Sequence, residues 1–164
     1  MDDIIIKKTR RKGRGIFANR NFKKGEKIID IKGKMLNYKQ LKKLGRYALV
    51  HYLAINENIF IGPSHDLDDY INHSCNPNAG IKIKGRKAFL ISIKNIKNGE
   101  EITCDYSTII ENNWKMSCMC GEKNCRKIIR NFEHLPRKTQ KKYIKLGIVS
   151  DFIVKKFSEK SSKR

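Results

Sequence analysis

Residues 69–78 read Asp-Tyr-Ile-Asn-His-Ser-Cys-Asn-Pro-Asn, and this stretch decides more about the fold than any other. It combines a polar, turn-forming run with a histidine and a cysteine, two side chains that carry chemistry. An Asn-His pair in a loop is by itself most often a hydrogen-bonded turn. Cys75, however, lies in a loop that can reach a metal held elsewhere in the chain. The meaning of the stretch therefore depends on the segments on either side of it.

A second chemical signal is the run Cys-Met-Cys-Gly-Glu-Lys-Asn-Cys at residues 118–125. Its three cysteines can hold one zinc ion, but a structural zinc site needs four protein ligands. Cys75 and Cys104 are the remaining thiols, and spacing alone leaves the choice between them open. Cys104 lies in a predicted strand, where we expect it to be buried. Disulfides are the rival interpretation, but the first residues do not resemble a signal peptide, which favours a reducing compartment and metal.

Charge is distributed unevenly along the chain. The 164 residues include 37 Lys and Arg against 16 Asp and Glu, a net charge of +21, which suits non-specific contact with nucleic acid. An AT-rich genome produces the same abundance of lysine without selection for binding. Residues 47–81 and 99–114 nevertheless contain no Lys or Arg, and they hold eight of the 16 acids. They are either core segments or an acidic surface suited to a cationic substrate.

Short apolar runs separated by turn residues predict a β-rich core in a chain of one-domain length. We expect strands at 4–6, 16–18, 27–31, 59–61, 81–83, 88–93 and 101–106. We expect helices at 38–44, from about 135 to 146 and at 149–157, followed by a frayed end at 158–164. No apolar run reaches the roughly 18 residues of a membrane helix, so no membrane partner is expected. The predicted fold class is α+β, mainly β, with a short helical C-terminal tail.

Two further segments complete a pattern with residues 69–78 and the cysteine run. Residues 12–18 read Lys-Gly-Arg-Gly-Ile-Phe-Ala, and residues 99–106 read Gly-Glu-Glu-Ile-Thr-Cys-Asp-Tyr. In this order the four segments resemble the SET-domain protein lysine methyltransferases that carry a post-SET zinc segment. The resemblance implies a fold of several short twisted sheets, with the last motif threaded through a loop as a pseudoknot. It divides the chain into a SET catalytic domain at 1–110, a post-SET zinc-binding segment at 111–130 and a helical tail at 131–164.

The same resemblance implies a reaction and assigns roles to residues. S-adenosylmethionine (SAM) would donate a methyl group to the ε-amine of a lysine, Tyr106 would be the catalytic tyrosine, and a zinc ion would be structural. The implied cofactor-binding positions are Gly13, Arg14, Gly15, Tyr70, Asn72 and His73. The implied zinc ligands are Cys75, Cys118, Cys120 and Cys125. The segment around Arg126 and Ile128 is expected to cover the cofactor and one side of the substrate channel.

Four positions depart from the pattern of the family. Cys104 stands where a Tyr or Phe is common, and its small size predicts di- or trimethylation rather than monomethylation. Ile31 replaces a frequent active-site Tyr, Asp69 a frequent Arg, and Lys127 a frequent Gly. These departures bear on the methylation number and the substrate, and they leave every core motif in place.

The predicted function is therefore methylation of a basic protein, such as a histone tail or another Lys-rich protein. The alternative is an inactive SET scaffold that acts as a zinc-containing nucleic-acid or chromatin binding module. Such a scaffold would be free to lose Tyr106, Asn72 and His73, and all three are present. We expect an intracellular location, in the nucleus or on the chromosome if the chain acts in a eukaryote or a host, and otherwise in the cytoplasm.

Overall fold

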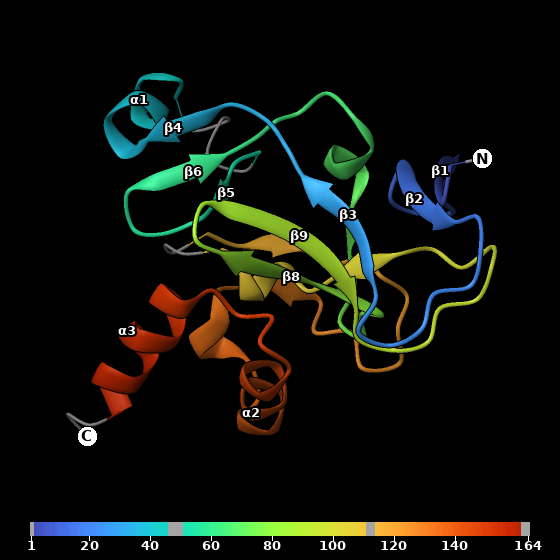
Figure 1. Cartoon of the computed structure of the whole chain (residues 1–164). Coiled ribbons are helices and arrows are strands. Elements are labelled where there is room, and N and C mark those ends of the chain that lie inside the picture. The colour runs from blue at the N-terminus through green and yellow to red at the C-terminus, as the bar shows by residue number, and fades with distance from the viewer. Residues whose placement is uncertain (1, 46–50, 111–113, 162–164) are drawn as a thin grey trace.

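The computed structural model describes residues 2–45, 51–110 and 114–161, and within them the chain forms several small sheets with helices at their edges (Figure 1). The first antiparallel pair is β1 (Ile4–Lys8) with β2 (Arg14–Ala18). The central sheet has the order β3 (Lys27–Ile31), β9 (Lys87–Ser92), β8 (Ala79–Lys84). A third sheet has the order β4 (Met35–Asn37), β6 (Ile59–Ile61), β5 (Leu53–Ala54). The predicted α+β class, mainly β, is confirmed.

Two short pairs connect the outer segments to these sheets. The strands β7 (Asn72–His73) and β10 (Thr103–Cys104) are parallel, and β11 (Met116–Ser117) and β12 (Ile128–Ile129) are antiparallel. The helices are α1 (Tyr38–Lys43), α2 (Arg137–Leu146) and α3 (Asp151–Ser161). Single 3₁₀ turns lie at η2 (Leu67–Tyr70), η3 (Tyr106–Thr108) and η4 (Phe132–His134). No described helix has the length and apolar content that crossing a bilayer requires.

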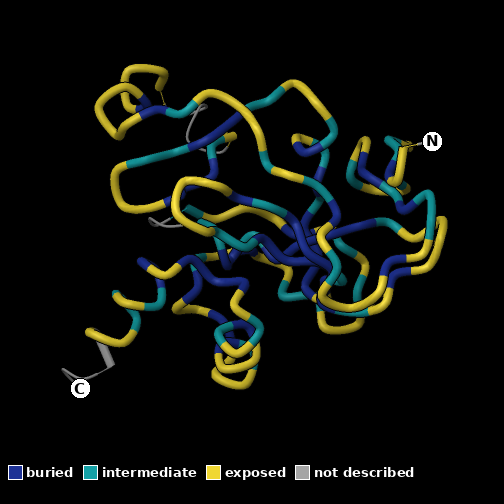
Figure 2. The backbone as a smooth tube through the Cα atoms, viewed as in Figure 1, coloured by how far each residue is buried: buried dark blue, intermediate teal, exposed yellow. Residues whose placement is uncertain are grey.

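The main hydrophobic core lies between the sheets, and Figure 2 shows many of the buried stretches of backbone gathered at the centre of the molecule. It is built from apolar side chains of the predicted strands, among them Ile16, Leu90 and Ile102, each of which is fully buried. Segment 100–106 runs beside β2, where Ile102 N–H donates to the Ile16 carbonyl at 2.9 Å, and it pairs with β7 on the other side. Segment 100–106 therefore joins β2 to β7, and the threading of this motif through a loop stays a prediction.

The C-terminal tail has a second core of its own against the central sheet. Phe132, Tyr143, Ile148 and Phe152 are buried there together with Ile91 of β9. A Cβ atom at Gly80 would lie 2.6 Å from Cγ2 of Ile148, so only glycine lets the tail approach β8 this closely. The tail is therefore packed onto the fold as a structural layer.

Two sequence expectations about local structure were wrong in detail. The strand expected at 101–106 is only Thr103–Cys104, because Asp105 caps the 3₁₀ turn that begins at Tyr106. The end expected to fray from residue 158 is helical through Ser161, since α3 begins at Asp151 and continues past the last buried residue. The base-free stretches are described only in part, because residues 47–50 and Glu111 lie outside the described residues. The start of the segment at 111–130 lies outside them as well.

Candidate functional site

The parallel pair β7–β10 brings residues 69–78 against residues 99–106. Cys104 is paired with His73 in its register, and the Cys104 carbonyl accepts from Ser74 N–H at 3.0 Å. The Asn78 side chain holds the next strand residues, because its Nδ2 donates to the Glu101 carbonyl at 2.9 Å and its Oδ1 accepts from Thr103 N–H at 2.9 Å. The two motifs thus form one hydrogen-bonded unit.

Tyr106 lies at the centre of this unit. Its hydroxyl donates to the Ile71 carbonyl at 2.7 Å, and its backbone N–H donates to Nδ1 of His73 at 3.2 Å. The rings of His73 and Tyr106 are 5.4 Å apart. Burial, with smaller contributions from Cys104 and Glu101, raises the pKa of Tyr106, so its phenol is protonated and neutral. Burial also lowers the pKa of His73 to about 4.

Asn72 ties this unit to the glycine-containing turn of residues 13–15. Its Nδ2 donates to the Arg14 carbonyl and to Oε1 of Glu101, both at 3.0 Å. A Cβ atom at Gly15 would lie 2.5 Å from that Nδ2, so glycine is needed here to admit the Asn72 side chain. The Arg14 guanidinium in turn lies 4.7 Å from the ring centre of Tyr70. All the implied cofactor-binding positions therefore lie on interconnected segments around Tyr106.

An open cleft of about 240 Å³ adjoins the turn. Its walls include Arg10, Arg11, Lys12, Glu101, Met119 and Cys120. Nζ of Lys12 forms an ion pair with Oε2 of Glu101 at 2.9 Å. The cleft thus offers several cationic groups and one carboxylate to a ligand that carries both signs of charge.

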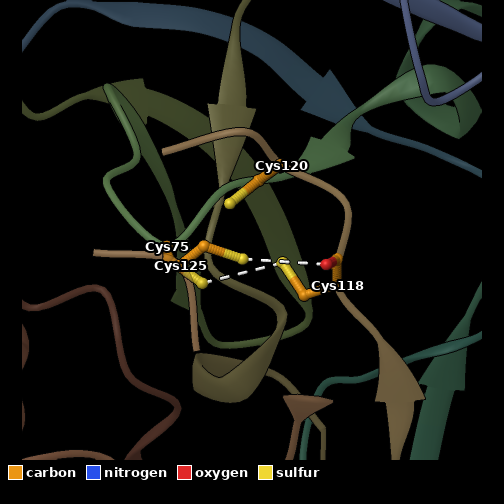
Figure 3. Close-up of side chains that lie close together, drawn as sticks. All are labelled: Cys75, Cys118, Cys120 and Cys125. Atoms are coloured by element: carbon orange, nitrogen blue, oxygen red, sulfur yellow. Dashed lines mark hydrogen bonds between the residues drawn. The ribbon is translucent and has the colours of Figure 1, made fainter. Parts of the chain in front are cut away.

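Four cysteines converge from two segments far apart in the sequence (Figure 3). The Sγ atoms of Cys75, Cys118, Cys120 and Cys125 all lie within 4.8 Å of one another. Sγ of Cys75 and Sγ of Cys118 are 3.7 Å apart, close to the edge of about 3.8 Å expected for a tetrahedron with Zn–S bonds of about 2.3 Å. The four thiols fit a post-SET zinc site.

Cys104 lies outside this cluster. It is buried in the main core, as expected from its strand, and burial raises the pKa of its thiol. For Cys120, burial works against ionisation, but hydrogen bonds from the backbone of Cys75 and Glu122 outweigh it and lower the pKa to about 7. A thiolate at that position suits a metal ligand.

Asp105 is a site residue that sequence reasoning missed. Its carboxylate is completely buried and receives both arms of Arg126, Nη1 to Oδ2 at 2.9 Å and Nη2 to Oδ1 at 2.7 Å. Ser107 N–H donates to Oδ1 at 3.1 Å, and the hydroxyl of Tyr143 on α2 donates to Oδ2 at 3.2 Å. We call Asp105, Arg126 and Tyr143 the aspartate node.

The aspartate node gives Arg126 a structural role. Its guanidinium points inward to Asp105 and Ser107, while Ile128, two residues later, is exposed. That the segment around Arg126 and Ile128 covers the cofactor stays a prediction. Tyr143 lies 38 residues beyond Asp105 and carries no motif, so no signal in the sequence could have paired them.

Three acids of the base-free stretches form ion pairs with bases from outside those stretches. Glu101 pairs with Lys12 at 2.9 Å, Asp105 with Arg126 at 2.7 Å, and Asp66 with Lys32 at 3.5 Å. These stretches contain no Lys or Arg of their own, but the fold brings bases from other segments next to their acids. The expectation of a locally acidic site therefore does not extend to these three carboxylates.

Comparison with known proteins places these motifs in a family. The SET domain family matches residues 13–107. The chain is 31% identical over 141 residues to the variant-silencing SET domain-containing protein of Plasmodium falciparum, covering 75% of this chain and 5% of that protein. It is 31% identical over 128 residues to the histone-lysine N-methyltransferase trithorax of Drosophila virilis, covering 71% of this chain and 3% of that protein.

A third relative is the H3 lysine-36 specific histone-lysine N-methyltransferase of Debaryomyces hansenii, 30% identical over 137 residues, which are 76% of this chain and 19% of that protein. The chain thus spans less than a fifth of the length of these relatives. The matched part still includes the motifs that surround Tyr106.

Proposed function

The chain belongs to the SET domain family, and on that premise we propose that it transfers a methyl group from SAM to the ε-amine of lysine in a histone or another Lys-rich protein. The observation that carries the proposal is the placement of Tyr106. Its hydroxyl and backbone are held by Ile71 and His73, directly beside Asn72 and the glycine-containing turn. Relatives named for histone-lysine methylation match this region of the chain.

The residues around the cleft fit SAM as a ligand. SAM carries a carboxylate, an ammonium, a sulfonium and an adenine ring. Arg10, Arg11 and Lys12 can receive the carboxylate, and Glu101 can receive a cationic group. We propose that Gly13, Arg14, Gly15, Tyr70, Asn72 and His73 form the rest of the cofactor site. When bound, SAM supplies an electrophilic methyl carbon for in-line displacement.

The protein must deliver the lysine as a neutral amine, because its lone pair forms the new N–C bond. A free lysine has a pKa of about 10.4, and a partly apolar site beside a positive sulfonium disfavours the ammonium form. Positioning the amine in line accounts for much of the remaining acceleration. Tyr106 is a neutral phenol, so it orients the amine or stabilises the polarised methyl through its oxygen and does not act as a base.

The zinc ion is proposed to be structural, held by Cys75, Cys118, Cys120 and Cys125. Cys120 also lines the cleft, so the metal would shape the cofactor site while contributing no step to the reaction. We propose the corresponding division of the chain into a catalytic domain at 1–110, a zinc segment at 111–130 and a tail at 131–164.

The product is proposed to be di- or trimethyl-lysine, because Cys104 is small where larger aromatic residues occur in the family. Mass spectrometry of a methylated substrate should show products beyond one methyl group. Cys104→Tyr should shift the products toward monomethyl-lysine. A wild-type product that stops at one methyl group would contradict this part of the proposal.

We also propose a nuclear or chromosomal location, because histones are found there. The second candidate function is a binding module without activity, favoured by the net charge of +21. The presence of Tyr106 with Asn72 and His73 argues for the enzyme.

The proposal is tested by incubating the protein with methyl-labelled SAM and mixed histones. Wild type should label histones, and Tyr106→Phe should lose about 100-fold or more of the rate, in the range of a lost catalytic group. Tyr38→Phe makes the same chemical change on an exposed tyrosine of α1 and should leave the rate unchanged. A fully active Tyr106→Phe variant would reject the assigned role, and a wild type that labels nothing while binding DNA would favour the binding module.

A further inference from the structure

The outer face of α2 is entirely cationic. Arg137, Lys138, Lys141, Lys142 and Lys145 are all exposed, and α2 contains no acidic residue. The spacing places Lys138, Lys141, Lys142 and Lys145 on one helical face. The opposite face carries the buried residues Gln140 and Tyr143. The charged residues of α2 are therefore exposed on one face, and the residues that pack lie on the other.

This face is electrostatically unmatched within the described residues. Lys138 and Lys142, and likewise Lys141 and Lys145, are like charges four residues apart, which repel on a helix. The ion pairs found in the described part of the chain include none of these four lysines. The helix α3, by contrast, combines Lys155 with Asp151 and Glu159. A polyanionic partner would relieve the repulsion that α2 carries by itself.

The cationic face continues onto the central sheet. A Cβ atom at Gly147, directly after α2, would lie 3.8 Å from Nζ of Lys82 on β8. Lys94 follows β9, and its Nζ donates to Oδ1 of Asn76 at 2.7 Å. Burial and then the charge of Lys142 lower the pKa of Lys94, while Glu122 and Glu100 act in the opposite direction. We call the outer face of α2 with Lys82 and Lys94 the basic face.

We propose that the basic face docks the phosphate backbone of duplex DNA. Duplex DNA carries one negative charge per about 1.7 Å of axis, and a helix of about 15 Å can face a run of such charges. Single-stranded nucleic acid is held largely by stacking on aromatic rings, and the exposed residues of α2 include none. Lysine dominates the face, and a lysine contacts phosphate as a point charge, so we expect binding without sequence preference.

The basic face lies close to the residues around Tyr106, so DNA bound there could bring a substrate to the proposed site. Tyr143 on the opposite side of α2 donates to Asp105, the residue before Tyr106. DNA on the basic face would therefore lie about one helix diameter, roughly 10 Å, from the aspartate node. This part rests on the proposed function, because it makes the preferred substrate a lysine of a basic protein already bound to DNA.

The docking is tested with a fluorescent 20-base-pair duplex and the full chain, by anisotropy at several salt concentrations. The variant Lys138→Gln, Lys141→Gln, Lys145→Gln removes three contacts and should reduce the slope of log K against log salt by about 2.7, from roughly 0.9 per phosphate contact. The matched control is Lys39→Gln, Lys42→Gln, Lys43→Gln on α1, which also removes three exposed charges. That control should leave most of the slope and affinity in place.

Equal weakening by the two triple variants would overturn the proposal, because it would mean that the net charge acts diffusely. Unchanged DNA binding in the α2 variant would also overturn it, as would tighter binding of single-stranded RNA of the same length. Circular dichroism melting of both variants confirms that each is folded. Glutamine is used because its helix propensity is close to that of lysine.

A second measurement compares methylation of nucleosomes with methylation of a free histone H3 peptide. The α2 variant should lose rate on nucleosomes, while its rate on the peptide should stay at the wild-type value. Equal rates of wild type and variant on nucleosomes would overturn the link between docking and substrate. If wild type methylates neither substrate, the proposed function fails, whereas the anisotropy result decides the docking separately.

Discussion

The two faces of α2 treat charge in opposite ways. On the inner face, Tyr143 reaches a carboxylate that has no exposed surface and that is matched by the two arms of Arg126. On the outer face, lysines of one sign stand in water beside one another. A charge withdrawn from water needs partners with good geometry, whereas a solvated charge tolerates like neighbours at small cost. The inner face therefore holds the fold together, and the outer face remains available to a partner.

The largest expected effect comes from removing one of the four cysteine ligands, Cys120, which also lines the cleft. Arg126 follows Cys125, and its backbone N–H donates to Sγ of Cys75 at 3.4 Å, so the cysteine cluster positions the arginine. Cys120→Ser should lower zinc affinity by more than about 100-fold and weaken SAM binding with it. Metal analysis after dialysis and calorimetry with SAM measure the two effects. Cys104→Ala is the control and should keep its zinc; intact SAM affinity after zinc loss would refute the coupling.

The next largest effect should come from breaking the aspartate node itself. Arg126→Met leaves the buried Asp105 carboxylate without its cation, and we expect the free energy of unfolding to fall by about 3–5 kcal/mol. Urea denaturation measures the change. Arg20→Met makes the same replacement at a half-exposed arginine that pairs with Asp3 and Glu26, both of them solvated, and should have a far smaller effect. Similar losses in both variants would mean that burial of the pair is unimportant.

A smaller effect should follow from removing only the contribution of the tail to the node. Tyr143→Phe deletes the hydroxyl that donates to Asp105 at 3.2 Å and keeps the packed ring, so we expect a loss of about 1–2 kcal/mol. Thermal unfolding measures it, with Tyr38→Phe on the exposed surface of α1 as the control. An unchanged melting temperature would show that the tail merely packs beside the node.

The smallest effect should come from the outer face. Lys141→Gln removes one of the repelling lysines, and the free energy of unfolding should change by less than about 0.5 kcal/mol. Chemical denaturation of wild type and variant in parallel measures this difference. A large loss of stability would mean that this lysine has a structural partner, and the contrast between the two faces of α2 would fail.

Much of the fold was predictable because it is local. Alternation and turns placed the strand at 27–31 and the hairpin of β8 and β9, and glycine placed the end of α2 at Gly147, which has a φ of 62°. The strand predicted at 101–106 is too long, because the apolar pattern of these residues does not reveal that the Asp105 side chain caps a turn. A cap is a side-chain contact, and periodicity reports only which face of an element is apolar.

The sequence by itself determined the chemical inventory: a tyrosine, an Asn-His pair, a glycine-containing turn and thiols at ligand spacing. It left open from spacing which of Cys75 and Cys104 would complete the cluster, and it indicated acidic stretches around the site. The tertiary structure brought Cys75 to the other thiols, buried Cys104 in the core and supplied Arg126 and Lys12 to the acids. Ligation and charge pairing act over a few ångströms in space, and only the folded chain brings residues that are 20 to 90 positions apart to that distance.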